Sequence, residues 1–113
     1  MKRDLISRTT RNHFREWLVG WTLREIDDLF TAHGFEQAFI PPELLPSGQR
    51  RSSVELFYES VEWSNPEHVA RMLRAYEDII FQIEDRSLPH VVQMLRYLER
   101  DGYVLEGNSL VAK

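Results

Sequence analysis

The sequence predicts a mainly α-helical domain, a compact five-helix bundle that ends in a small C-terminal β-hairpin. Apolar residues recur every three or four positions in five separate segments, which is the spacing of one buried helix face. Residues typical of helix ends separate these segments, and a Gly-Asn pair divides two short apolar runs near the C-terminus. The 113 residues, 42% hydrophobic and 28% charged, fit a single globular domain covering 1–113.

The first two helices are predicted from their end signals. Thr9 or Thr10 is expected to cap a helix that runs to about Val19 and ends at Gly20. Phe14, Trp17 and Leu18 form its apolar face. Thr22 to Glu25 then has the spacing of a capping box, and the second helix buries Leu23, Ile26, Leu29 and Phe30.

That second helix should end at Gly34 in a Schellman motif, with Phe35 folding back on the last apolar residues. Three prolines between residues 36 and 49 forbid a regular helix there, and we expect the apolar side chains of this segment to be buried. They are Phe39, Ile40, Leu44 and Leu45.

The third helix is predicted near Ser52, because Ser52 to Glu55 is another capping box. Its apolar residues nearly encircle it, so we expect this helix at the centre of the packing. They are Val54, Leu56, Phe57, Tyr58 and Val61.

The fourth helix is predicted from the cap Asn65 and from Pro66 to about Glu84, and Ser87 is expected to cap the fifth. The fourth buries Val69, Met72, Leu73, Tyr76, Ile79, Ile80 and Ile83, and the fifth buries Val91, Val92, Leu95 and Leu98. Asp101 and Gly102 end the fifth helix. Residues 103–106 and 109–111 then form a hairpin that must pack on the helices, through Leu105 and Val111.

Composition excludes several classes of function. The formal net charge of −4 disfavours binding to nucleic acid or to anionic membranes, except through a local basic patch. The absence of Cys excludes disulfides and thiolate zinc sites. Charges occupy the N-terminus where a signal peptide would be apolar, so we expect a cytoplasmic protein.

No cofactor or metal site is predicted, and no catalytic residue. The histidines His13, His33, His68 and His90 stand in no pattern of metal ligands. The sequence has no GxSxG motif and no glycine-rich phosphate loop. A small catalytic site assembled only in space is the remaining enzymatic alternative.

The candidate interaction site lies at the start of the third helix. Gly48, Arg50, Arg51 and Ser52 could together bind an anionic ligand, a nucleic-acid phosphodiester or an acidic segment of a partner, because a helix N-terminus and guanidinium groups both attract anions. In the alternative interpretation, Ser52 caps the helix while the two Arg pair with Glu43 or Glu55. Trp21, placed between two helices, is a candidate extension of the site.

A second hypothesis assigns DNA binding to the fifth helix. Gln93, Arg96, Tyr97 and Arg100 lie opposite its apolar stripe, and a hairpin follows, which is the order of a recognition helix and wing. The acidic Glu106 in the hairpin and the long preceding helix count against it.

Three stretches resemble the small helical N-terminal domains of AbiJ-type abortive-infection proteins of bacterial phage defence: WTLREIDDLFTAHGF, PSGQRRSSVELFYESVEWSNPEHVARMLRAYEDII and LRYLERDGYVLEGNSLV. The likeness extends from about Trp21 to Val111 and includes no catalytic signature. It implies a non-enzymatic sensor or adaptor, and it is compatible with the N-terminal module of a larger protein. Its implied partner is an effector or sensor module, and a homo-oligomer is compatible with it.

Overall fold

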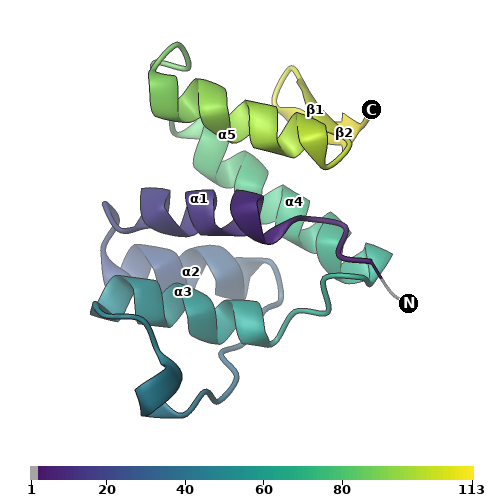
Figure 1. The fold of residues 1–113 in the computed structure, drawn as a ribbon. Helices are drawn as coiled ribbons and strands as arrows, with labels where there is room; N and C mark the ends of the chain where they lie inside the picture. The colour runs from purple at the N-terminus through teal and green to yellow at the C-terminus, as the bar shows by residue number, and fades with distance from the viewer. Residues whose placement is uncertain (1–2) are drawn as a thin grey trace.

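The computed structural model describes residues 3–113, which form five helices and one two-stranded antiparallel hairpin (Figure 1). The helices are α1 (Arg8–Leu18), α2 (Leu23–Ala32), α3 (Gln49–Glu59), α4 (Pro66–Phe81) and α5 (Pro89–Arg100). The strands are β1 (Tyr103–Glu106) and β2 (Ser109–Ala112), and Pro42–Leu44 forms one 3₁₀ turn. The predicted fold class is confirmed.

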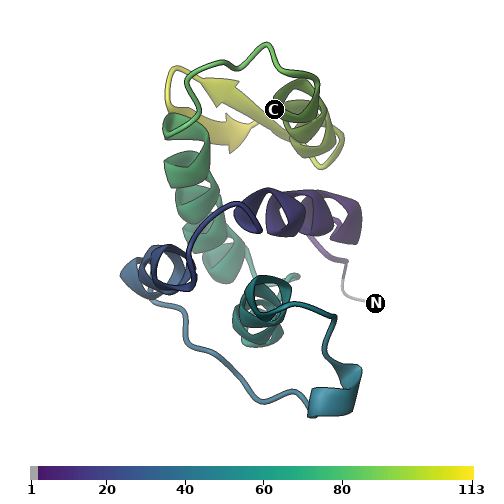
Figure 2. The same ribbon diagram turned by 90° about the vertical axis from the view of Figure 1, so that its left-hand side faces the viewer.

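The helices are arranged around α1, which lies between the α2–α3 pair and α5 with its hairpin (Figure 1). Figure 2 shows α4 standing alongside both layers, from α2 and α3 at one end to the hairpin at the other. Fully buried Phe14 of α1 stacks on Tyr76 of α4, with ring centroids 3.8 Å apart. The expectation that α3 is central is therefore wrong, because α1 and α4 hold the two layers together.

Several predicted helix ends are confirmed. Thr22 and Glu25 form the reciprocal capping box, with bonds of 3.0 and 3.1 Å. Gly34 has a φ of 84°, and the amides of Gly34 and Phe35 donate to Thr31 O and Phe30 O as a Schellman motif requires. Asn65 Oδ1 accepts from the amide of Glu67 at 2.9 Å, so it caps α4 as expected.

The predicted caps of the first and third helices are wrong. Ser7, rather than Thr9 or Thr10, caps α1. Gly48 precedes α3, which begins at Gln49, because the glycine turns with a φ of 96° while three good helix formers follow it. Ser52 therefore lies inside α3, and its Oγ donates to Pro46 O at 3.0 Å.

The ends of α4 and α5 also differ from the prediction. Leu88 precedes α5 without a side-chain cap, since the Ser87 hydroxyl donates to Asp85. The helix α4 ends at Phe81, three residues earlier than expected. The buried stripe of α5 includes Met94, which was not predicted, and lacks the predicted Val92 and Leu95. Leu95 packs at the margin of the core.

The hairpin packs on the helices through Leu105, as expected, and through Leu110 in place of Val111. Leu105 pairs with Leu110, so these two share a face, and Val111 pairs with Val104 on the other face. Leu110 is 1% exposed. Its amide donates to Glu77 Oε2 at 2.6 Å, and its carbonyl accepts from Arg74 Nη2 at 2.7 Å, so β2 is bound to α4.

Asp101 joins the end of α5 to the start of α1. Its Oδ2 accepts bonds from the Ser7 amide at 2.9 Å, from Ser7 Oγ at 3.1 Å and from Thr10 Oγ1 at 2.6 Å. A carboxylate at a helix N-terminus is favoured by the helix dipole. Within residues 3–113, no helix has the combination of length and apolar character needed to cross a membrane.

Candidate functional site

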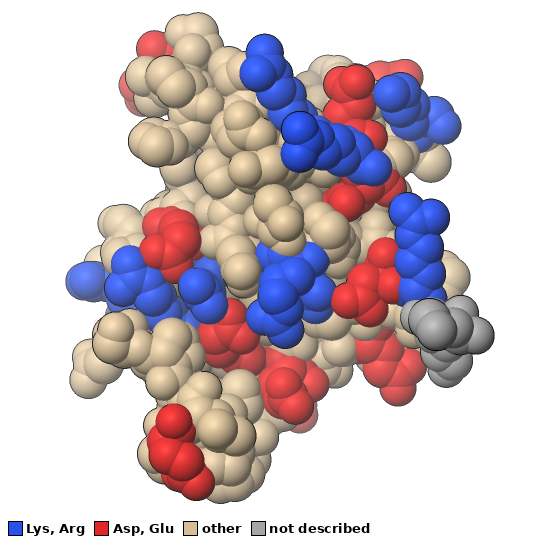
Figure 3. All heavy atoms as spheres, viewed as in Figure 1, with Lys and Arg blue, Asp and Glu red and all other residues tan. Residues whose placement is uncertain are grey.

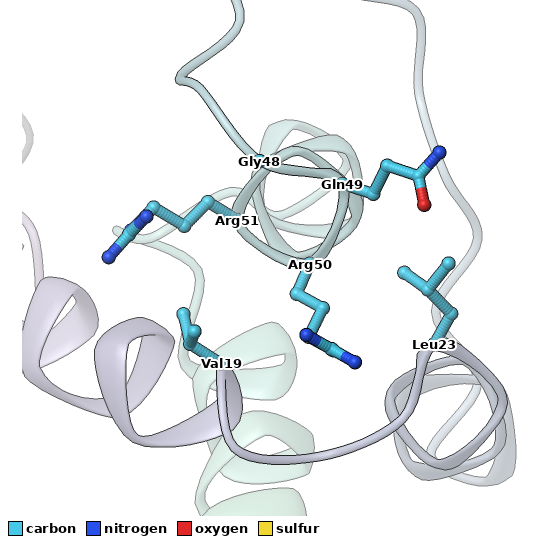
Figure 4. Close-up of a pocket in the computed structure, with 6 residues that line it drawn as sticks. All are labelled: Val19, Leu23, Gly48, Gln49, Arg50 and Arg51. Carbon is cyan, nitrogen blue, oxygen red and sulfur yellow. The ribbon is translucent and has the colours of Figure 1, made fainter.

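The predicted interaction residues gather where the N-terminus of α3 faces the end of α1 and the start of α2. Figure 4 shows Arg50 pointing into a hollow between Val19 and Leu23, while Arg51 points toward α1. The hollow has a volume of about 350 Å³. Gly48 permits this arrangement, since its positive φ lets the chain enter α3 with the first helical turn facing the α1–α2 connection.

Arg51 is held by α1. Its Nε and Nη2 donate to Glu16 at 2.8–2.9 Å in a bidentate arrangement, so the expected pairing with Glu43 or Glu55 is wrong for Arg51. Glu55 instead accepts from Arg15 Nη1 at 2.6 Å. The hydrogen bonds from Arg51 lower the pKa of Glu16, and Glu16 in turn raises the pKa of Arg51. Arg51 therefore joins α3 to α1, and its charge is already compensated.

Arg50 differs from its neighbour. It is exposed, and among the residues that the structure describes it has no ion-pair partner and no side-chain hydrogen bond. The Ser52 hydroxyl is used by Pro46, so it supports the loop. Of the predicted anion-binding set, Arg50 is the side chain with an uncompensated charge at the hollow.

A second hollow continues this site on the other side of Leu23 and Gln49. It has a volume of about 640 Å³, lies between α2 and α3, and shares Leu23, Gly48 and Gln49 with the first. Its other lining residues are Asp27, Gln37, Ser52, Ser53 and Leu56. The two hollows form a continuous groove along the α2–α3 pair.

The loop of residues 36–48, which leads into α3, exposes large apolar side chains. Phe39 is 81% exposed and Leu44 is 71% exposed, so the expectation that both are buried is wrong. Leu23, at the groove itself, is 41% exposed, so the expectation that the second helix buries it is also wrong. We call the loop–α3 surface the groove, lined by Leu23 and Arg50, together with the exposed Phe39 and Leu44 of the loop that leads into α3. Exposed apolar patches mark interaction sites in soluble proteins.

Trp21 does not extend the loop–α3 surface. It lines a different groove, between α2 and α4, together with Phe81 at the end of α4. This groove has a volume of about 450 Å³. The structure thus brings Gly48, Arg50 and Arg51 together and places Trp21 in a separate site.

The face of α5 proposed for DNA is partly covered. Arg96 and Arg100 are exposed, but Gln93 and Tyr97 are half-buried. The His13 ring of α1 meets Tyr97 edge-on at 5.4 Å. Lys113 joins the two Arg around a hollow of about 350 Å³ that Glu99 also lines. Figure 3 shows basic side chains over α5, and over α1 and α3 a band in which basic and acidic side chains alternate.

The histidines are dispersed over the fold. His33 Nε2 lies 2.6 Å from Asp78 Oδ2, and His68 Nδ1 accepts from the Glu62 amide at 3.0 Å. His13 Nε2 lies 2.8 Å from the His90 carbonyl. Across residues 3–113, no three His, Asp or Glu side chains are grouped so as to share a metal ion.

Sequence reasoning missed a buried polar cluster behind α1. Arg11 is 7% exposed, stacks over Trp63 at 4.5 Å and pairs with Asp4 at 2.9 Å. Its carbonyl accepts from the Tyr58 hydroxyl, which also bonds the Tyr76 hydroxyl at 2.8 Å. Burial raises the pKa of both phenols, so they stay protonated near neutral pH. The burial of Arg11 could have been predicted from its position, because Arg11 lies one turn before Phe14 on the same helix face.

No family model matches the chain, and no curated protein and no solved structure shows a significant match to it.

Proposed function

We propose that this chain is a non-enzymatic sensor or adaptor domain of a cytoplasmic bacterial antiphage abortive-infection system, which binds an effector or sensor module through the loop–α3 surface. The observation that carries the proposal is the exposure of Phe39 and Leu44 on the loop that leads into α3, together with exposed Leu23 and the uncompensated guanidinium of Arg50 at the start of that helix. The assignment to phage defence rests on the sequence resemblance described above.

The surface has the composition of a protein-binding site. Burying an exposed Phe or Leu side chain contributes about 1.5–3 kcal/mol, and the residues that dominate binding are enriched in large aromatic side chains and Arg. Phe39 and Leu44 supply the apolar part, and Arg50 can receive a carboxylate or phosphate of the partner. The groove along α2 and α3 has room for partner side chains.

The proposal is tested by phage plating on cells that carry the protein with its effector. Combined replacement of Phe39 and Arg50 by Ala should reduce protection by at least about tenfold, since each residue that dominates an interface contributes more than ~1 kcal/mol. Arg24→Ala is the matched control, because Arg24 is equally exposed on α2 but lines neither hollow of the surface. Full protection by a stably folded Phe39/Arg50 double variant would exclude this surface.

A winged-helix-like DNA-binding regulator is the second candidate, and one observation favours it. Arg96, Arg100 and Lys113 converge on a single hollow beside the hairpin. Glu99 pairs with Lys113 at 3.4 Å there, which reduces the positive charge available to phosphates. Salt-dependent binding to duplex DNA that is lost in Arg96→Ala/Arg100→Ala, and kept in the Phe39/Arg50 variant, would favour this candidate over the adaptor.

A further inference from the structure

We propose that the groove between α2 and α4 is a second docking site, which binds a cationic segment of a partner protein that carries a large apolar side chain. We call it the α2–α4 groove and define it by Trp21, Glu25, Asp28, Asp78 and Phe81. It lies apart from the loop–α3 surface, since the two share no lining residue. The proposal therefore does not depend on the function assigned to that surface.

The groove offers an apolar floor and two aromatic walls. The floor includes Leu29, which belongs to the core and is almost completely buried. Trp21 is half-exposed at the start of α2, and Phe81 is 66% exposed at the last residue of α4. Ile79 and Ile80 complete the buried stripe of α4, so Phe81 adds nothing to the core and projects outside it. An apolar side chain of a partner can be buried between the two aromatic rings.

The rim is acidic. Glu25, Asp28 and Asp78 line the groove, and no Lys or Arg lines it. Glu25 accepts the Thr22 amide in the capping box, and Asp78 is bonded to His33, whereas Asp28 has no ion-pair partner anywhere in residues 3–113. These carboxylates attract Lys or Arg side chains, and a guanidinium or ammonium can also lie against the Trp21 ring.

The shape and charge favour a peptide segment over other cations or nucleic acid. Residues 25–32 of α2 span two turns, roughly 10 Å, which matches one face of a short amphipathic helix or strand. The carboxylates repel nucleic acid. They are also spread along the groove, and no group of three acidic or His side chains in the described chain is placed to hold a metal ion.

The test uses the full chain and a fluorescent 14-residue amphipathic peptide of Leu and Lys, with a Leu–Glu peptide of the same pattern as the control. Fluorescence anisotropy should show saturable binding of the Lys peptide only, and backbone NMR shifts should map to the groove. Phe81→Ser and Asp28→Lys should each weaken binding by about tenfold or more, as for central interface residues. Both side chains are exposed, so melting temperatures should stay unchanged.

Matched variants make the result specific. Phe39→Ser removes an exposed Phe from the loop–α3 surface, and Asp27→Lys makes the same charge change one residue away, outside the groove. Both should leave the affinity within about twofold of the unmodified chain. An equal loss of peptide affinity with Asp27→Lys and Asp28→Lys would mean that negative charge attracts the peptide without a defined site, and would overturn the proposal. Absence of peptide binding would also overturn the proposal. A dimer in sedimentation that Phe81→Ser dissociates would overturn it too, because a second copy of the chain would then occupy the groove.

Discussion

Single residues carry the long-range connections of this fold, and Asp101 is the clearest case. One carboxylate oxygen accepts the Ser7 amide, the Ser7 hydroxyl and the Thr10 hydroxyl, although these residues are more than 90 positions away in the sequence. Local patterns reveal that Asp101 ends a helix, but they do not reveal which amides it accepts. The same limit explains the error at Arg51, whose partner Glu16 lies on α1 rather than on a neighbouring turn.

We predict that Asp101→Ala lowers the free energy of unfolding by about 1–3 kcal/mol, because it leaves the Ser7 amide and the Thr10 hydroxyl without their acceptor. Urea midpoints measure this directly. Asp28→Ala, at an exposed carboxylate without an ion-pair partner in residues 3–113, should change stability by less than about 0.5 kcal/mol. Equal midpoints for the two variants would contradict the role given to Asp101.

The Arg51–Glu16 pair predicts a small pH effect. The folded pKa of Glu16 is lowered below its ordinary value of 4.5, so the stabilisation is fully present above pH 4.5 and is lost as pH falls through the lowered folded pKa. Because Glu16 is 45% exposed, this contribution stays below about 1 kcal/mol. Glu16→Gln should remove that part of the acid dependence measured between pH 3 and 6. An unchanged acid dependence in the variant would show that the pair adds no stability.

At the scale of elements, the signals that the sequence predicts well are those made within one turn. The Thr22 capping box and the Gly34 Schellman end depend on residues fewer than six positions apart, and both are confirmed. The start of α3 was misplaced because Ser52 to Glu55 has the same local spacing, while the turn at Gly48 and the acceptor at Pro46 decide the outcome. A capping-box pattern inside a run of helix formers is therefore ambiguous.

The helix ends predict a ranked pair of variants. Thr22→Ala should cost about 1 kcal/mol through the lost cap. Gly102→Val should cost more, because Gly102 has a φ of 100°, which a β-branched side chain strongly disfavours. No atom lies within 4 Å of a Cβ built at Gly102, so the cost arises from the backbone rather than from crowding. Denaturant midpoints in the reverse order would contradict this assignment of the helix end.

At the scale of the whole molecule, α4 connects every layer, and the hairpin depends on it. The sequence predicted the hairpin and its need for a helical support, but not the packed residue, because the choice between Leu110 and Val111 follows from the strand register. The sequence also suggested Trp21 as an extension of the site at Arg50. The two residues lie in separate grooves, and this separation follows only from the packing of α2 on α4.

We predict that Leu110→Ala lowers the free energy of unfolding by about 2–5 kcal/mol, as is typical of a buried Leu. Val111→Ala, at the partly exposed position beside it, should cost clearly less. Removing residues 103–113 should lower the melting temperature appreciably, because α4 and α5 then lose the strands that pack on them. An unchanged melting temperature after truncation would mean that the hairpin is detached.

The central claim is that the loop–α3 surface meets a partner protein. The most direct test introduces a photoreactive phenylalanine analogue at position 39 or at position 96, in cells that carry the protein and its effector under phage challenge. Both side chains are exposed, and each belongs to one of the two alternative binding surfaces. We predict a discrete protein crosslink from position 39 that disappears with Arg50→Ala. Crosslinks to DNA from position 96, with none to protein from position 39, would contradict the adaptor function and favour the winged-helix alternative.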